Sequence, residues 1–139
     1  MVFSLYIVSK KQGLQNITHL IEAPVQTHVR DDQMTDGLCT LFIKHTSASL
    51  IIQENADPSA KHDLENWLNR LVPENDPLYT HTTEGSDDMP AHIKSVLTST
   101  SLTIPIQNGK LALGIWQGIY LWEHRYYGGE REIVVHISG

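Results

Sequence analysis

The sequence has only one cysteine among its 139 residues, so the chain cannot form an internal disulfide. Cys39 lies in the apolar segment 38–43, a setting in which a free cysteine is usually a buried core thiol. Proteins without disulfides are typical of reducing compartments, and we therefore expect a cytoplasmic protein.

Long hydrophobic runs are also missing. A membrane-spanning helix needs about 20 consecutive apolar residues, and no segment approaches that length. At the start of the chain a short apolar stretch precedes Lys10 and Lys11, which is the reverse of the charge order in a signal peptide. We therefore expect neither a signal peptide nor a membrane span.

Positive charge is scarce as well. Lys and Arg number 10 against 16 Asp and Glu, which gives a net charge of -6, and no local cluster of basic residues offsets it. Such a chain repels the phosphates of nucleic acids and anionic lipids. We therefore expect no nucleic acid and no membrane as partner.

The composition that remains is ordinary for a globular protein, with 40% hydrophobic and 19% charged residues and no repeat or low-complexity tract. A chain of this length has the size of one domain. We predict a single domain over residues 1–139.

Three segments have helical patterns. The clearest is 58–71, where Asp57 is a good N-cap, Pro58 fits the first helical position and apolar residues recur every three or four positions. Segment 18–30 also has helical spacing, although Pro24 should then lie in the first turn. A further helix is predicted to begin at Asp88. Its predicted buried side chains are Met89, Ile93, Val96 and Leu97.

Strands are predicted where β-branched and alternating apolar residues occur. The predicted segments are 2–8, 38–44, 102–106, 111–115, 115–124 and 133–137. Asn108-Gly109 favours a tight type I′ hairpin, and Pro105 restricts its strand to an edge or to a free amide side. Segment 115–124 is bulky on both faces, so helices, another sheet or a subunit must cover each face. These elements together predict an α+β fold.

Eight histidines are many for this length, although a single histidine is more often a solvated side chain than a metal ligand. His45 ends a strand on its inward side, His81 lies in a polar loop and His92 flanks the stripe of the helix after it. Three neutral imidazoles with an open fourth position suit Zn²⁺ or a similar divalent metal. The remaining histidines for which we predict no site role are His19, His28, His62 and His136.

Carboxylates offer fewer clear signals. Glu123 shares a strand face with apolar residues, so it needs a partner such as Arg125, a metal or a substrate. Asp57 is explained by capping alone. For Asp88 we favour a role at the helix N-terminus, where a carboxylate complements the dipole and caps free amides, over a role in a site.

Several motifs resemble the YjbQ-like family of small proteins, whose members are often labelled secondary thiamine-phosphate synthase enzymes, and the resemblance covers most of the chain. The motifs are segments 45–50, 54–58 and 88–94, and a closing signature from Ser101 through Gly109 and Gly114 to 116–119. The resemblance implies an antiparallel, β-rich, sandwich-like α+β fold with two or three helices. It also implies a homotrimer with a site near subunit boundaries, built around His45, His81 and His92.

These patterns lead to three hypotheses. The first is a small-molecule enzyme of the labelled class, in which a divalent metal on the three histidines polarises a phosphate or water and Glu123 or Asp87 moves a proton. The alternatives are a non-catalytic trimer that binds a metabolite or metal, and a metal-assisted hydrolase. We expect a phosphorylated substrate, contacted by Thr46, Ser47, Asn55, Gln117 and Lys94.

Overall fold

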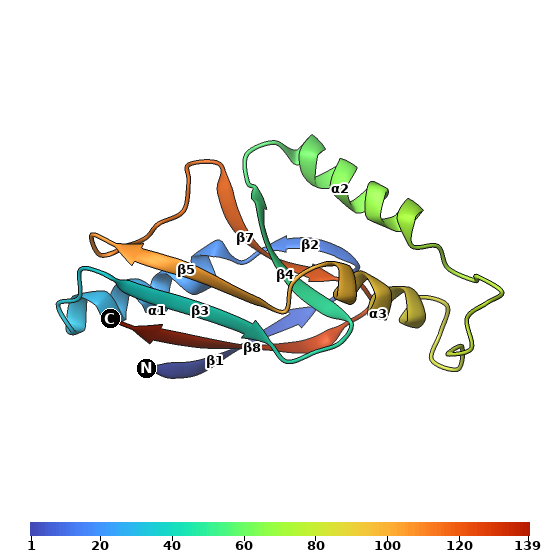
Figure 1. Cartoon of the computed structure of the whole chain (residues 1–139), viewed down its shortest axis with the longest axis horizontal. Coiled ribbons are helices and arrows are strands. Elements are labelled where there is room, and N and C mark those ends of the chain that lie inside the picture. Colours follow the sequence, from blue (N-terminus) through green and yellow to red (C-terminus); the bar gives the residue numbers. More distant parts are fainter.

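A computed structural model describes all 139 residues and contains two antiparallel sheets and three helices (Figure 1). The larger sheet has the strand order β1-β8-β3-β5-β6 and the smaller one β2-β7-β4. The strands are β1 (Val2–Ser9), β2 (Gly13–Asn16), β3 (Gly37–Ile43), β4 (Ala48–Glu54), β5 (Ser101–Gln107), β6 (Lys110–Leu111), β7 (Gln117–Glu123) and β8 (Gly129–Ser138). The helices are α1 (Thr18–Asp31), α2 (Pro58–Leu71) and α3 (Asp88–Leu97). The expected sandwich-like α+β fold is confirmed.

The main core lies between the two sheets and is completed by α1. On β3, alternate residues Cys39, Leu41 and Ile43 are almost fully buried, as the alternation of the sequence predicts. Burial raises the pKa of the Cys39 thiol to about 11, so this cysteine is an unreactive core residue.

Strand β7 has apolar side chains on both faces because two cores meet at it. Ile119 and Leu121 belong to the main core, whereas Tyr120 and Trp122 pack with Leu68 of α2 in a second core. Both faces are therefore covered within one chain, by the larger sheet on one side and by α2 on the other.

The hairpin and its neighbouring strands differ in detail from the prediction. Asn108 and Gly109 both have positive φ, as a type I′ turn requires. One edge of β5 pairs with β3, and its other edge has only the two-residue β6 as a neighbour, opposite Ile106 and Gln107. The predicted strand 111–115 is wrong beyond Leu111, and β7 begins at Gln117, because a turn joins the Gln117 amide to the Gly114 carbonyl. Two strands, β2 and β4, were not predicted.

The helices occur where the sequence places them, with two corrections. Helix α1 continues through Pro24, which lies beyond its first turn. Helix α3 turns a different face inward: Val96 and Leu97 are exposed, whereas Lys94 and Ser95 are buried. None of the three helices is long and apolar enough to cross a membrane.

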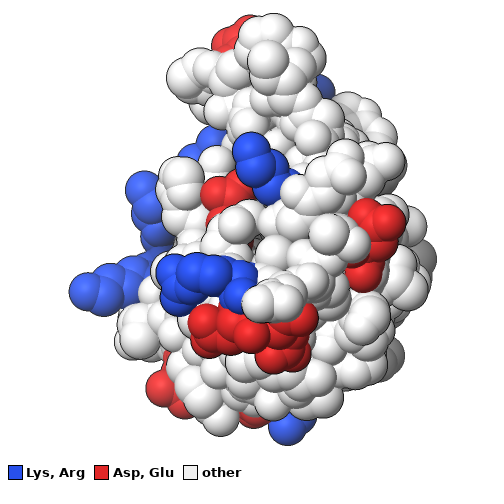
Figure 2. All heavy atoms as spheres, turned by 90° about the vertical axis from the view of Figure 1, so that its left-hand side faces the viewer, with Lys and Arg blue, Asp and Glu red and all other residues white.

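The chain ends lie together, and the α2–α3 connection lies at the opposite side of the molecule (Figure 1). The amino group of Met1 donates to the Ile137 carbonyl, which joins the outer strand β1 to β8. On the face near the termini, acidic and basic side chains lie next to one another, and neither sign forms a continuous patch (Figure 2).

Candidate metal centre

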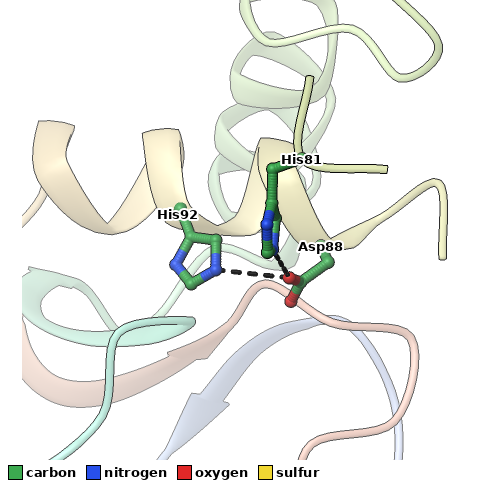
Figure 3. A group of neighbouring side chains, drawn as sticks. All are labelled: His81, Asp88 and His92. Carbon is green, nitrogen blue, oxygen red and sulfur yellow. Dashed lines mark hydrogen bonds and ion pairs between the residues drawn. The ribbon is translucent and has the colours of Figure 1, made fainter. Parts of the chain in front are cut away.

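Three side chains converge at the start of α3 (Figure 3). Asp88 and His92 are four residues apart on this helix and therefore share a face, and His81 reaches them from the preceding loop. His81 Nε2 lies 2.6 Å from Asp88 Oδ2, and His92 Nε2 lies 3.3 Å from the same oxygen. One potential ligand atom from each residue lies within 4.8 Å of the other two, so this cluster could hold a metal ion.

Asp88 is a buried carboxylate at the centre of this cluster, with 2% of its surface exposed. Burial alone would raise the pKa of its carboxyl, but the hydrogen bond from His81 and the charge of Arg125 outweigh burial and lower it. Asp88 lies in the first turn of α3, as predicted, but its side chain does not cap the helix, because its oxygens face the two histidines and the arginine.

Arg125 connects the cluster to its surroundings. Its guanidinium donates through Nε to Asp87 Oδ2 at 2.9 Å, through Nη1 to Asp88 Oδ1 at 2.8 Å and through Nη2 to the Glu84 carbonyl. Burial would raise the pKa of Asp87, yet the hydrogen bonds from Arg125 and from the Tyr126 amide lower it. Both aspartates are thus held ionised, with Asp88 Oδ2 left to face the histidines.

The hydrogen bond of His92 determines which of its nitrogens can bind a metal. Its Nδ1 lies 3.1 Å from the Thr46 carbonyl, which can only accept, so Nδ1 carries a proton. In the neutral ring Nε2 then holds a lone pair that points toward Asp88 Oδ2. Two electron-rich atoms at 3.3 Å repel each other unless a proton or a metal ion lies between them.

His45 lies outside this cluster. Its Nε2 accepts a hydrogen bond from the Glu132 amide at 2.8 Å. Burial and the charge of Arg131 lower the pKa of His45, which favours the neutral ring. Two of the three predicted ligands, His81 and His92, are therefore brought together, with Asp88 beside them in place of His45.

Glu123 is completely buried and paired with Arg131 rather than with Arg125. The guanidinium of Arg131 donates to Glu123 Oε1 at 2.7 Å and Oε2 at 2.6 Å, and its Nη2 also donates to Ser47 Oγ. The proposed substrate contact Ser47 is thus part of this buried network.

Asn55 and Gln117 lie at the other end of the smaller sheet. The Asn55 side chain donates to the Gln117 carbonyl, and the Gln117 side chain accepts from the Gly114 amide. Gln117 and Glu123 are the two ends of β7, a length of roughly 20 Å at the usual rise of a strand. Within one chain, Asn55 and Gln117 are therefore separated from the histidine cluster.

Lys94 of α3 is buried, and its ammonium donates to Asn69 Oδ1 at 2.6 Å. The ring of His124 is buried nearby, bonded to Ser49 at one nitrogen and without a partner at Nδ1. Burial lowers the pKa of His124 to about 3, and the charges of Lys94 and Arg131 act in the same direction. Among the other histidines, His62 is exposed and contacts Asn66 on its own helix, as predicted.

Comparisons with known proteins agree with this fold. The family model described as "UPF0047 protein YjbQ-like" matches residues 6–139. A UPF0047 protein from Synechocystis sp. is 53% identical over 97% of this chain and 89% of its own length. The YjbQ protein of Escherichia coli O157:H7 is 42% identical over 98% of this chain and 96% of its own.

Solved structures are similar over nearly the whole chain. A conserved hypothetical protein from Thermus thermophilus superposes with a TM-score of 0.82 at 35% identity, covering 98% of this chain and 99% of that one. A YjbQ/UPF0047 protein from Clostridium acetobutylicum reaches 0.78 at 37% identity, with 99% of each chain covered.

Proposed function

The chain belongs to the YjbQ-like UPF0047 family, and we propose that it is a metal-dependent enzyme that acts on a phosphorylated small molecule. The observation that carries the proposal is the geometry around Asp88 Oδ2, which lies 2.6 Å from His81 Nε2 and 3.3 Å from His92 Nε2 while the Thr46 carbonyl holds Nδ1 of His92. Two imidazoles and one carboxylate with open positions are a ligand set typical of catalytic zinc sites. We therefore propose His81, Asp88 and His92 as the ligands, with His45 near but not on the metal.

The chain's own residues would orient this centre. When bound, the metal would withdraw charge from a phosphate oxygen or from a water molecule. Thr46 fixes the ring of His92, and Arg125 fixes Asp88, which is how outer residues commonly orient metal ligands. Asp87 and Glu123 are each held by an arginine, and this pairing favours a positioning role over the proton transfer predicted from the sequence.

The specific reaction that we propose is the one implied by the motifs that resemble the YjbQ-like family, whose members are often labelled secondary thiamine-phosphate synthases. A pyrimidine group would pass from its pyrophosphate ester to the nitrogen of a thiazole phosphate. The bond to the pyrophosphate oxygen breaks, a carbon–nitrogen bond forms and pyrophosphate leaves.

The one buried and unpaired cysteine supports action in a reducing compartment such as the cytoplasm.

Metal content tests the proposal directly. Protein purified without an affinity tag should contain about one transition-metal ion per chain, and His81→Ala, Asp88→Asn and His92→Ala should each lose it. His62→Ala is the matched control, because His62 is exposed and lies on α2. Wild-type protein without metal, or ligand variants that keep it, would contradict the proposed centre.

Turnover distinguishes the enzyme hypotheses from binding alone. Formation of thiamine phosphate and pyrophosphate from the two phosphorylated substrates would support the synthase reaction. Release of inorganic phosphate from a substrate panel would support the hydrolase instead. A metal-loaded protein that retains a metabolite and never converts it would favour the non-catalytic binding protein.

We also propose a homotrimer, supported by apolar surface that one chain leaves uncovered. Trp67 and Leu71 on α2 are each 53% exposed, and Leu97 on α3 is 55% exposed. They line a mostly apolar hollow of about 270 Å³ between the two helices. Sedimentation should give three times the chain mass of 15.7 kDa, and Trp67→Lys should shift the protein toward monomer. A wild-type protein that sediments as a monomer would exclude the trimer.

A further inference from the structure

A hollow of about 330 Å³ adjoins the metal-ligand cluster and is large enough for a small metabolite. We call it the His92 hollow, because His92 belongs both to the cluster and to the wall of the hollow. Its lining residues are His45, Thr46, His92, Ser95, Val96 and Thr100. A molecule in this hollow would therefore contact His92, one of the three proposed metal ligands.

His45 and His92 are hydrogen-bonded to the rest of the chain through different ring nitrogens. A ring nitrogen that accepts a hydrogen bond carries no proton, and Nε2 of His45 accepts from the Glu132 amide. The proton of the neutral His45 ring is therefore on Nδ1, which has no partner within the chain. His92 has the reverse arrangement, with its Nδ1 proton held by the Thr46 carbonyl and its Nε2 turned to Asp88 Oδ2.

This difference gives the two histidines different chemistry. A metal binds a nitrogen lone pair, which His92 offers and His45 does not, since its Nε2 is occupied and its Nδ1 is protonated. His45 instead presents an N–H donor, and its natural partner is an oxygen with negative charge.

Other features of the hollow also suit an anion. The hydroxyl groups of Thr46 and Thr100 make no hydrogen bond within the chain and can donate to the same ligand. A divalent cation bound by Asp88 would add positive charge next to His92, which favours an anion in the adjoining hollow. Each of the three guanidinium nitrogens of Arg125 already donates to an acceptor in the chain, and Arg125 does not line the hollow, whereas His45 and the two threonines do.

A second hollow touches the cluster on the His81 side, but it is less suitable. It measures about 140 Å³, and its lining includes the carboxylate of Asp76. A carboxylate disfavours an anionic ligand. The His92 hollow is larger and has no acidic residue in its lining.

We propose that the His92 hollow is the phosphate subsite of the enzyme, in which His45 donates from Nδ1 to an oxygen of a phosphate group held beside the proposed metal ligand His92. The inference rests on the proposed metal-dependent function and names how its substrate is held. His45 is thereby a substrate-binding residue and not a metal ligand.

Cobalt-loaded protein and inorganic phosphate test the subsite. The visible spectrum of bound Co²⁺ reports metal coordination, and its change with added phosphate gives the phosphate affinity. His45→Ala should bind the same amount of cobalt as wild type but bind phosphate roughly 10- to 100-fold more weakly, because a hydrogen bond to a charged group is lost. His45→Asn should restore most of the affinity, since its amide places a donor near the position of Nδ1.

Thr46→Val and Thr100→Val provide a second measurement that does not depend on His45. Each should weaken phosphate binding with unchanged cobalt content, whereas His62→Ala should change neither. Loss of cobalt in His45→Ala would make His45 a metal ligand and overturn the proposal. Unchanged phosphate affinity in His45→Ala would overturn it as well.

Failure of the metal proposal can be distinguished from failure of the phosphate-subsite proposal. If the wild type binds no cobalt, calorimetry of phosphate binding to the metal-free protein replaces the spectrum. Binding that still depends on His45 would then leave an anion site without a metal, which would overturn both the metal centre and the placement of the phosphate beside a metal ligand. Cobalt binding without phosphate binding would overturn only the subsite.

Discussion

At the scale of single residues, two arginines organise the polar end of the molecule. Arg125 joins Asp87 and Asp88, and Arg131 joins Glu123 and Ser47. Both use the planar fork of the guanidinium, which a lysine could not reproduce at two oxygens. These contacts leave Asp88 Oδ2 facing His81 and His92, so the ligand geometry depends on a residue that touches no histidine.

Replacement of Arg125 tests this dependence. Arg125→Gln should weaken the affinity for Zn²⁺ roughly 10- to 100-fold, because Asp88 loses the donor that orients it. Competition with a chromogenic chelator measures the affinity. Arg30→Gln is the control, since Arg30 is 76% exposed and pairs only with Asp31. Equal zinc affinity in both variants would mean that Asp88 is positioned without Arg125.

At the scale of elements, the turn between β7 and β8 holds the buried Glu123–Arg131 pair. A Cβ atom at Gly128 would clash with Glu123 Oε1, so only glycine leaves room for this carboxylate. The preceding residues of the turn bring Arg125 back toward α3. One short connection thus sets both the ion pair within the sheet and the arginine of the candidate metal centre.

Gly128→Ala should therefore destabilise the protein by about 3 kcal/mol or more, because displacement of Glu123 leaves a buried charge without its partner. Denaturant unfolding measures the change. The double variant with Glu123→Gln should lose less than the sum of the single changes, since both act on one contact. Gly114→Ala is the control, because its new Cβ meets only the side chain of Gln117. A fully additive double variant would contradict this explanation.

At the scale of the whole molecule, two apolar cores meet at β7, and the buried imidazole of His124 lies beside the second one. His124 lies there with 1% of its surface exposed, and its pKa is about 3 against an ordinary value of 6.5. The folded state thus keeps His124 neutral over a pH range in which the unfolded chain binds a proton. Stability that is present above pH 6.5 must be lost as the pH falls toward 3.

We expect the free energy of unfolding of the metal-free protein to fall between pH 6.5 and 4.5 by up to about 1.4 kcal/mol per pH unit for His124. His124→Gln should reduce this slope. His45, whose pKa is also lowered, contributes in the same direction, so His45→Gln serves as the comparison. Urea unfolding with a chelator present measures the slope without metal binding. An equal slope in His124→Gln and wild type would show that His124 is not the group responsible.

Local sequence determined several parts of this protein. Alternation along β3, the Asp57-Pro58 start of α2 and the Asn108-Gly109 turn all act through neighbours in the chain, and each prediction is confirmed. The family followed from short motifs. The presence of His81 and His92 in one site also followed from the sequence, since a polar loop leads directly into the helix that carries His92.

Tertiary structure decided the features that depend on contacts far apart in sequence. The inward face of α3 follows from packing against β4, which leaves Val96 outside although it is apolar. The partner of Glu123 is Arg131 because the β7–β8 turn brings it there. The only sequence signal for Asp88 was its four-residue spacing from His92. The structure adds that Arg125 holds one of its carboxylate oxygens, which leaves the other to face the histidines. Sequence periodicity indicates which residues can share a face, but hydrogen bonds between distant elements decide which nitrogen of a histidine is free.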